Sequence, residues 1–333
     1  MTPTLAVGVD IGGTNLKIAL VDRDARMVGQ QSVPTVAFRG AEAVVKEVVR
    51  LAGGLLTDRA KSWSDVAGVG VASPGPLDLR TGRIIKAANL PGWRDVPLRD
   101  MMAGATGRPA LLDNDANAAA FGEFWSGRIR ADHQATSNQS AGDLVLLTLG
   151  TGVGAGVILN GKILHGARDN AAELGHMIVV VDGLNCPCGQ RGCLEQYASA
   201  AAVARQAELA IRNGDASVLA GCKQRGETLD SAAVAHAAER GDALAVRVWD
   251  QTCLFLAVAI INIQHVYNPM LVLLGGGMSA AGEFLLSRIR HFLAQHQWTL
   301  CADLPEVRLA ELGNDAGVIG AAGMVWDSPA GYA

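Results

Sequence analysis

The sequence predicts an α/β protein of two domains, and three observations lead to this expectation. The chain has 333 residues, which exceeds the usual size of one hydrophobic core. Short apolar runs that end in glycine turns alternate with longer stretches of helical periodicity, as they do in α/β proteins. One series of strand, glycine turn, strand and polar turn also occurs twice, once around Gly12 and once around Gly150, which indicates a duplicated domain.

The first copy of this series lies at the N-terminus, where residues 7–10 and 16–21 are expected to form strands around the first glycine turn. The elements that follow are expected to be a third strand, a helix, two more strands and a second helix, at residues 25–36, 41–56, 66–72, 109–112 and 117–125. A polar, nonperiodic stretch at 129–143 is interpreted as a solvent-exposed loop near a domain boundary.

The second copy follows this loop, with strands expected at 144–149 and 155–159 around the second glycine turn. Another strand that ends in glycines is expected at 271–274. The long alanine-rich stretch 198–263 is expected to be helical, and a last helix is expected at 314–326.

Charge and composition exclude several kinds of partner. The net charge is −4, with 28 basic and 32 acidic residues, no long basic run and only 5% aromatic residues, so we expect no nucleic acid partner. The longest apolar run, 253–263, is shorter than the ~20 residues of a membrane span, and residues 1–9 lack the features of a secretory signal. We therefore expect no membrane association and a cytoplasmic protein whose cysteines stay reduced.

The three glycine turns point to a nucleotide. Glycines let backbone N–H groups approach phosphate oxygens closely, and Thr14 and Thr151 add a hydroxyl to two of the turns. Each turn alone could be a tight hairpin. The chain has no P-loop motif. Residues 150–155 fit the dinucleotide fingerprint, but they run into a predicted strand and hairpin, whereas the fingerprint should open a helix.

Two acidic positions are candidates for chemistry. Asp10 precedes the first glycine turn, where a carboxylate suits a Mg²⁺ site through water, although it could also cap the turn. Asp113-Asn114-Asp115 follows a predicted strand and precedes a predicted helix, so these side chains could simply cap that helix. The carboxyl end of a strand is also where open α/β sheets place ligands.

One histidine and three cysteines predict a metal site. His176, Cys186, Cys188 and Cys193 form a Cys₃His set, which is typical of closed, structural zinc sites. Two glycines between the cysteines allow the sharp turns that bring three sulfurs round one ion. A redox pair and unligated buried thiols are the alternatives, and the expected cytosolic setting favours zinc. The remaining cysteines are isolated and are expected in the core: Cys222, Cys253 and Cys301.

Together these motifs resemble a known family. Residues 9–15 resemble the first phosphate motif of the superfamily of sugar kinases, Hsp70 and actin. The pieces that narrow the resemblance to the ROK family (repressors, uncharacterised reading frames and kinases) run in family order over most of the chain, at residues 73–78, 88–93, 113–117, 150–154, 172–176, 186–195 and 274–277. The resemblance implies two ribonuclease-H-like (actin-like ATPase) domains with a hinged central cleft for sugar and ATP.

The resemblance also implies domain boundaries. Residues 1–122 are expected to form a small N-terminal domain with the first phosphate motif, part of the sugar site and the catalytic Asp. Residues 123–313 are expected to form a large domain with the second phosphate motif, the zinc knuckle and the adenosine site. Residues 314–333 are expected to contain a helix that packs back on the first domain.

The resemblance assigns roles to particular residues. Asp115 is expected to be the catalytic base, since phosphoryl transfer has a loose transition state in which a weak base suffices. The expected sugar-binding residues are Gly75, Asn89, Asn114, Asp115, Glu173, His176 and Glu195. The expected residues for ATP and Mg²⁺ are Asp10, Gly12, Gly13, Thr14, Asn15, Gly150, Thr151, Gly152, Gly154, Gly276 and Gly277. His176 is expected to ligate zinc with one ring nitrogen and to face the sugar with the other.

The activity implied is ATP-dependent phosphorylation of a hexose hydroxyl, with glucose to glucose 6-phosphate as the leading expectation, by a homodimer. A kinase for N-acetylmannosamine or N-acetylglucosamine is the alternative, because residues 168–172 depart from the glycine-rich loop of the family before Glu173. A sugar-responsive transcriptional regulator would need an N-terminal helix-turn-helix, whereas the phosphate motif begins at Asp10. A non-catalytic sugar-binding module is disfavoured by Asp115 and the phosphate turns.

Overall fold

The computed structural model describes residues 3–87, 89–133, 142–222, 226–296, 298 and 304–327. The chain divides into two compact units. Unit 1 contains residues 1–142, 156–172 and 312–333, and unit 2 contains residues 143–155 and 173–311. The domain boundaries that the family resemblance implies stay a prediction.

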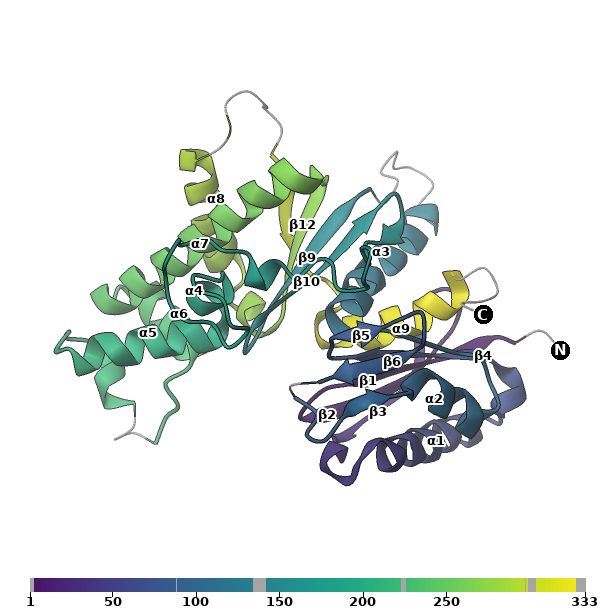
Figure 1. Ribbon diagram of the computed structural model, residues 1–333. Coiled ribbons are helices and arrows are strands. Elements are labelled where there is room, and N and C mark those ends of the chain that lie inside the picture. Colours follow the sequence, from purple (N-terminus) through teal and green to yellow (C-terminus); the bar gives the residue numbers. More distant parts are fainter. Residues whose placement is uncertain are drawn as a thin grey trace. The chain divides into compact units, whose positions relative to one another are not determined.

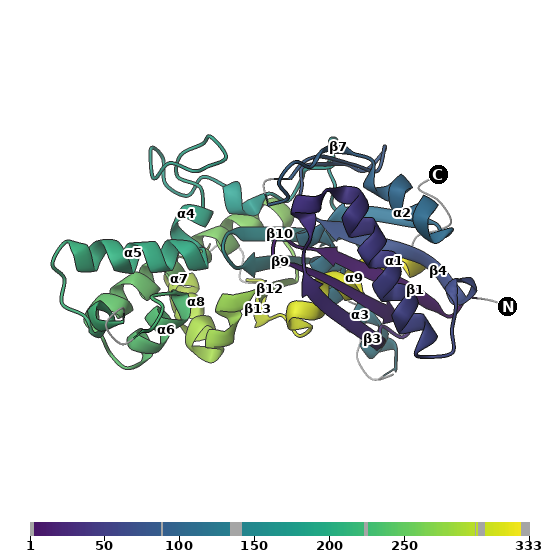
Figure 2. The same cartoon turned by 90° about the horizontal axis from the view of Figure 1, so that it is seen from below.

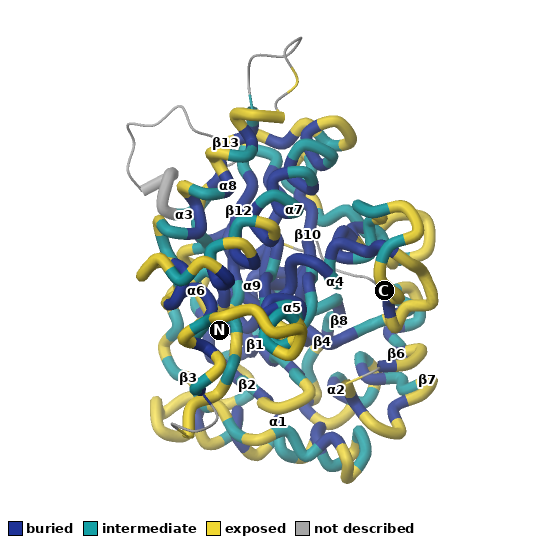
Figure 3. The backbone as a smooth tube through the Cα atoms, turned by 90° about the vertical axis from the view of Figure 1, so that its left-hand side faces the viewer, coloured by how far each residue is buried: buried dark blue, intermediate teal, exposed yellow. Residues whose placement is uncertain are grey.

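Unit 1 is built on a five-stranded sheet with the order β3-β2-β1-β4-β8. Its strands are β1 (Leu5–Ile11), β2 (Asn15–Val21), β3 (Met27–Pro34), β4 (Val66–Ser73) and β8 (Ala110–Asn114). The first three strands pair antiparallel, whereas β1, β4 and β8 run parallel. β1 and β4 are buried along almost their whole length (Figure 3), as expected of central strands covered on both faces.

Four helices cover this sheet. The helices α1 (Ala41–Thr57) and α2 (Leu98–Thr106) lie on one face, and α3 (Asp115–His133) and α9 (Ala316–Asp327) lie on the other (Figures 1 and 2). Val44, Val45, Val48 and Leu51 recur at helical spacing and are buried in α1, which confirms the helix expected at 41–56. α3 is longer than expected and includes residues 129–133 of the predicted loop, because charged residues such as arginine favour a helix as readily as a solvent loop. The rest of that loop, 134–141, lies outside the described residues.

Glycines set how closely α9 approaches the sheet and α3. A Cβ added at Gly70 would lie 1.7 Å from the Ala321 carbonyl oxygen, and one at Gly8 would lie 2.0 Å from the Val318 carbonyl oxygen. A Cβ at Gly320 would lie 1.7 Å from the Ala118 carbonyl oxygen of α3. The backbones therefore meet without side chains between them, which holds α3 close to the strands.

A small three-stranded antiparallel sheet also belongs to unit 1. It consists of β5 (Leu77–Asp78), β6 (Arg83–Lys86) and β7 (Arg94–Val96). These strands were not predicted, because runs of two to four residues carry no readable alternation. Trp93 just before β7 is 3% exposed and donates its indole N–H to the Ala37 carbonyl oxygen, so it belongs to the core of unit 1.

A second five-stranded sheet has the order β11-β10-β9-β12-β13. Its strands are β9 (Leu144–Leu149), β10 (Val153–Leu159), β11 (Lys162–Ile163), β12 (Leu271–Gly275) and β13 (Glu306–Leu309). β12 runs parallel to both β9 and β13, and β10 and β11 form the hairpin that was predicted after the second glycine turn.

The helices of unit 2 are grouped around α7. They are α4 (Glu195–Ala198), α5 (Ala200–Arg212), α6 (Ser231–Glu239), α7 (Ala243–Tyr267) and α8 (Glu283–His296). α7 packs against the other four (Figure 1). It is the one described helix that is long and apolar enough to cross a membrane, yet 56% of its most apolar window is buried within the protein. Cys253, which is expected in the core, is buried in α7, and so is Ile263 at the other end of the apolar run.

Short 3₁₀ helices complete the described structure. They are η1 (Ala37–Arg39), η2 (Trp63–Asp65), η3 (Leu174–His176), η4 (Val218–Gly221), η6 (Gly277–Ala281) and η7 (Gly313–Asp315). Cys222 follows η4 and is buried, as expected, whereas Cys301 lies outside the described residues.

Candidate functional site

The first glycine turn joins β1 to β2 in unit 1. The Gly12 amide donates to the Asn15 carbonyl oxygen at 2.9 Å, which closes the turn. The hydroxyl of Thr35 donates to the Gly12 carbonyl oxygen at 2.7 Å. Asn89 lies directly against the turn, because a Cβ at Gly13 would be 3.0 Å from the Asn89 Cβ. The fold thus brings an expected sugar residue next to the expected phosphate turn.

Asp10 lies beside this turn, in a hollow of about 810 Å³ that the turn lines together with Asn15, Lys17 and Asp315. Lys17 Nζ is 2.9 Å from Oδ1 of Asp315, the residue directly before α9. Desolvation and the nearby negative charge of Asp115 raise the pKa of Asp10 to about 6, and Lys17 opposes this rise. A bound cation would relieve the repulsion between the two carboxylates, so the residues fit a Mg²⁺ site.

The expected catalytic cluster lies where β8 ends and α3 begins. The Asn114 side-chain oxygen accepts from the backbone amides of Ala116 at 2.9 Å and Asn117 at 3.3 Å, so Asn114 is the residue that caps α3. A Cβ at Gly75 would lie 3.7 Å from Asn114 Nδ2. Gly75, Asn114 and Asp115, three of the expected sugar-binding residues, therefore lie together in unit 1.

Asp115 is the first residue of α3. Desolvation raises the pKa of its carboxyl group, and hydrogen bonds from the Ala116 amide and the Asn114 side chain partly oppose the rise. A carboxylate with a raised pKa is a stronger base than an exposed one, which suits proton abstraction from a hydroxyl.

Asp113 is the buried carboxylate of this cluster, with 4% of its surface exposed. Its Oδ1 accepts from the Asn114 amide at 2.7 Å and from Asn117 Nδ2 at 3.0 Å. Its Oδ2 lies 2.7 Å from His165 Nε2. Sequence reasoning missed His165, because it belongs to no motif and is 52 residues away along the chain.

The expected zinc ligands are assembled in unit 2. The ligand atoms of His176, Cys186, Cys188 and Cys193 all lie within 4.8 Å of one another. His176 Nδ1 is 3.7 Å from Cys186 Sγ, and the sulfurs of Cys188 and Cys193 are also 3.7 Å apart. Zn–S bonds of about 2.3 Å in a tetrahedron place sulfurs about 3.8 Å apart, so the four groups fit one zinc ion. Gln196 Nε2 lies 3.7 Å from Cys186 Sγ as an outer donor.

Glu195 connects this zinc knuckle to the second glycine turn. It opens α4 two residues after Cys193, and its Oε2 accepts from the Val153 amide at 3.1 Å. A Cβ at Gly152 would lie 2.1 Å from the same oxygen. The expected sugar residue Glu195 and the expected phosphate residue Gly152 therefore lie in contact. Glu173 and His176 lie at the two ends of η3, with Glu173 exposed.

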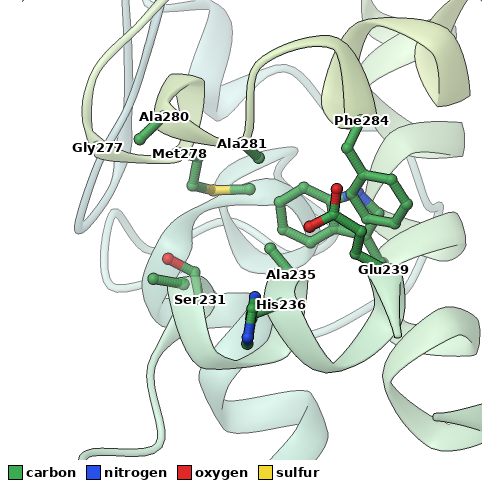
Figure 4. A pocket seen from close by; sticks show the side chains of 11 residues that line it. Ser231, Ala235, His236, Glu239, Gly277, Met278, Ala280, Ala281 and Phe284 are labelled. Atoms are coloured by element: carbon green, nitrogen blue, oxygen red, sulfur yellow. The ribbon is translucent and has the colours of Figure 1, made fainter. Parts of the chain in front are cut away.

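The third glycine turn opens onto a pocket of about 210 Å³ in unit 2 (Figure 4). Gly276 has φ +83°, and a Cβ there would lie 2.6 Å from the Leu149 carbonyl oxygen, so glycine is required. Gly277, Met278 and Phe284 line one side of the pocket, and α6 forms the other. The pocket combines apolar walls with a few polar groups, His236 and Glu239 among them, as sites for flat heteroaromatic rings do. The α6 residues carry no motif, so sequence reasoning missed them.

Comparison with known proteins places the chain in a family. The family model described as ROK family matches residues 6–328. The chain belongs to the ROK family. The resemblance that the sequence motifs predicted is therefore confirmed.

A glucokinase, an N-acetylmannosamine kinase and one solved structure are among the similar proteins. A glucokinase of Halalkalibacterium halodurans is 39% identical over 320 residues, which are 96% of this chain and 94% of that protein. An N-acetylmannosamine kinase of Citrobacter koseri is 33% identical over 316 residues, with 95% and 97% covered. The crystal structure of a ROK glucokinase from Streptomyces griseus in complex with glucose and AMPPNP has a TM-score of 0.76 and 31% identity, and 97% of this chain and 100% of that chain are covered. This likeness confirms the predicted α/β, actin-like fold class of a ROK sugar kinase.

Proposed function

We propose that this protein is a ROK sugar kinase that transfers a phosphoryl group from ATP to glucose and forms glucose 6-phosphate. The match along nearly the whole chain to a glucokinase and to a structure holding glucose and AMPPNP carries this proposal. The grouping of Gly75, Asn114 and Asp115 at the end of β8 supports it, because that is where such folds place ligands.

Asp115 is the proposed catalytic base. Its carboxylate accepts the proton of the attacking sugar hydroxyl, and the raised pKa makes it a better acceptor. Asn114 uses its side-chain oxygen to cap α3, and its Nδ2 group, which donates to Asp115, has a second N–H that can donate to a sugar hydroxyl. Gly75 and Asn89 complete the sugar-binding residues that unit 1 supplies.

The proposed nucleotide residues come from all three glycine turns. Residues 12–15 and 150–154 offer backbone N–H groups to the phosphates, and Gly276 and Gly277 lead to the pocket proposed for the adenine ring. Asp10 would hold Mg²⁺ through water. When bound, Mg²⁺ neutralises charge that develops on the transferred phosphoryl group.

The zinc ion is proposed to be structural, with His176, Cys186, Cys188 and Cys193 as its four ligands. It would hold Glu173 and His176, two proposed sugar residues, on one folded loop. Glu195 follows the last cysteine, and we propose that it binds sugar while it stays hydrogen-bonded to the Val153 amide.

The preferred acceptor sugar distinguishes a glucokinase from an amino-sugar kinase. Release of ADP would be measured with ATP and glucose, mannose, N-acetylglucosamine or N-acetylmannosamine as acceptor. We expect the highest kcat/KM with glucose. A higher kcat/KM with N-acetylmannosamine would instead assign the enzyme to the amino-sugar kinases, to which the 33% identical relative belongs by name. Glucose binding without any ADP release would favour the remote alternative, a sugar-responsive regulator.

We also propose that the enzyme acts in the cytoplasm as a homodimer, without nucleic acid or membrane. The net charge of −4 and the burial of α7 support the absence of these two partners. Light scattering during size-exclusion chromatography would give the mass of the assembly.

A further inference from the structure

His165 lies outside every motif, yet its ring contacts the carboxylate that supports the catalytic turn. We propose that His165 is a positioning residue for phosphoryl transfer, which acts through Asp113 to hold the Asn114–Asp115 turn in place. This inference rests on the proposed kinase function.

The buried carboxylate of Asp113 depends on its hydrogen-bond donors. Buried charged groups are costly unless donors satisfy them, and Asp113 is 4% exposed. Its Oδ1 is occupied by the Asn114 amide and Asn117 Nδ2, whereas His165 Nε2 serves its Oδ2. Loss of the imidazole would therefore leave one oxygen of this carboxylate without its donor.

The position of the Asp113 carboxylate affects the proposed base through the backbone. Its Oδ1 accepts from the Asn114 amide at 2.7 Å, and Asn114 in turn caps the first turn of α3. Asp115 lies in the chain between Asn114 and Ala116, the first residue whose amide Asn114 caps. A rotation of the Asp113 carboxylate would therefore displace the peptide groups on which Asp115 sits.

His165 is itself held in place within unit 1. Its carbonyl oxygen accepts from the Ala171 amide at 3.0 Å, and the preceding Leu164 amide donates to Val157 of β10 at 2.8 Å. Asp169 Oδ2 in the same loop accepts from the Leu79 amide just after β5, at 3.0 Å. The loop 165–171 thus contacts both the catalytic turn and the small sheet that follows Gly75.

The charge on the His165 ring also favours its contact with Asp113. Burial lowers the pKa of His165, but the hydrogen bond to Asp113 and the negative charges of Asp113 and Asp169 outweigh it, so the net direction is upward. These two carboxylates are the charged groups that act on the ring among the described residues. A protonated ring donates a charge-assisted hydrogen bond, which is stronger than a neutral one.

The test compares His165→Met with His165→Gln. Methionine fills a similar volume without a donor, whereas the glutamine amide can reach Asp113 as Nε2 does. For His165→Met we expect kcat with glucose to fall at least ~10-fold while both KM values stay within about threefold, because a misplaced base slows chemistry more than binding. His165→Gln should recover most of kcat. His291→Gln, an exposed histidine of α8, serves as the matched control and should keep wild-type kcat.

A double-mutant cycle with Asp113→Asn tests whether His165 acts through Asp113. The double variant should lose little more kcat than the worse single variant, since both changes break one chain of contacts. Three results would each overturn the inference. They are wild-type kcat in His165→Met, an equal loss of kcat in His165→Gln, and additive losses of kcat in the cycle. A wild-type enzyme inactive with every sugar of the panel would overturn the proposed function itself, and the inference with it.

Discussion

At the scale of single residues, the proposed base works against the stability of the fold. Asp115 places a desolvated negative charge near Asp10, and the pKa of each carboxyl group is raised. A raised pKa means that the folded state prefers the protonated form, so the contribution of these two groups to stability is greatest at low pH. It is lost as the pH rises through the folded-state pKa. The folded protein therefore bears the cost of each of these charges as it forms with rising pH.

Asp115→Asn is predicted to trade activity for stability. The amide cannot accept the hydroxyl proton, so kcat should fall by ~10²–10⁴, while glucose binding by calorimetry should persist. The Tm should rise at pH 7, because the variant removes a buried charge and its repulsion of Asp10. The gain in Tm should shrink as the pH falls, because the raised pKa lets the wild-type carboxyl group take up a proton more readily than an ordinary Asp does. Unchanged turnover would refute the assignment of the base, and a lower Tm at pH 7 would refute the electrostatic account.

At the scale of elements, the zinc knuckle and the glycine contacts of α9 hold different parts of the site. The knuckle is a stretch of loop with short 3₁₀ and bridge contacts, so bonds to the proposed zinc ion would add to its stability. α9 instead lies on β1 and β4 with almost no space between backbones.

Cys186→Ser is predicted to remove zinc. Elemental analysis should find about one zinc per wild-type chain, since the four ligands form one closed set. The variant should hold far less and should bind glucose more weakly, because Glu173 and His176 lose their support. Cys222→Ser, a buried cysteine outside the knuckle, is the matched control and should keep the metal. Wild-type protein purified without chelator but free of zinc would contradict the prediction.

Gly70→Ala is predicted to destabilise unit 1 strongly. Its Cβ would lie 1.7 Å from the Ala321 carbonyl oxygen, so α9 must move away from β4. We expect a loss of several kcal/mol in the free energy of unfolding, at the upper end of about 1–3 kcal/mol for overpacking. Gly53→Ala in α1 has no atom within 4 Å of the new Cβ and should stabilise the helix by about 0.5–1 kcal/mol. Equal changes in the free energy of unfolding by urea for Gly70→Ala and Gly53→Ala would argue against the close contact between β4 and α9.

At the scale of the whole molecule, sequence patterns predicted the parts that depend on neighbours in the chain. The strands around Gly12 and Gly150 and the helix at 41–56 follow from local periodicity, and the Cys₃His set from ligand spacing. Three features depend on contacts between distant segments and had no local signal. They are the pairing of His165 with Asp113, the hydrogen bond from Val153 to Glu195, and the pocket between α6 and η6.

Glucose is predicted to stabilise the whole protein by mass action. At 100 times its Kd, a ligand that binds only the folded state adds about 2.7 kcal/mol to the free energy of unfolding. The Tm should therefore rise with glucose in both the wild type and Asp115→Asn, because the latter lacks only the base. A larger rise with N-acetylmannosamine than with glucose would contradict the proposed acceptor.

The glycine contacts around α3 have an evolutionary consequence. The helix that begins with Asp115 packs backbone to backbone against α9. Almost any substitution at Gly320, or at the α3 residues that it contacts, would therefore displace the proposed base. The loop 165–171 is mostly exposed and is joined to the site by a few hydrogen bonds. Mutations there can accumulate without loss of the fold. Drift is therefore expected at the exposed positions of this loop, whereas His165 is expected to be retained together with the base that it positions.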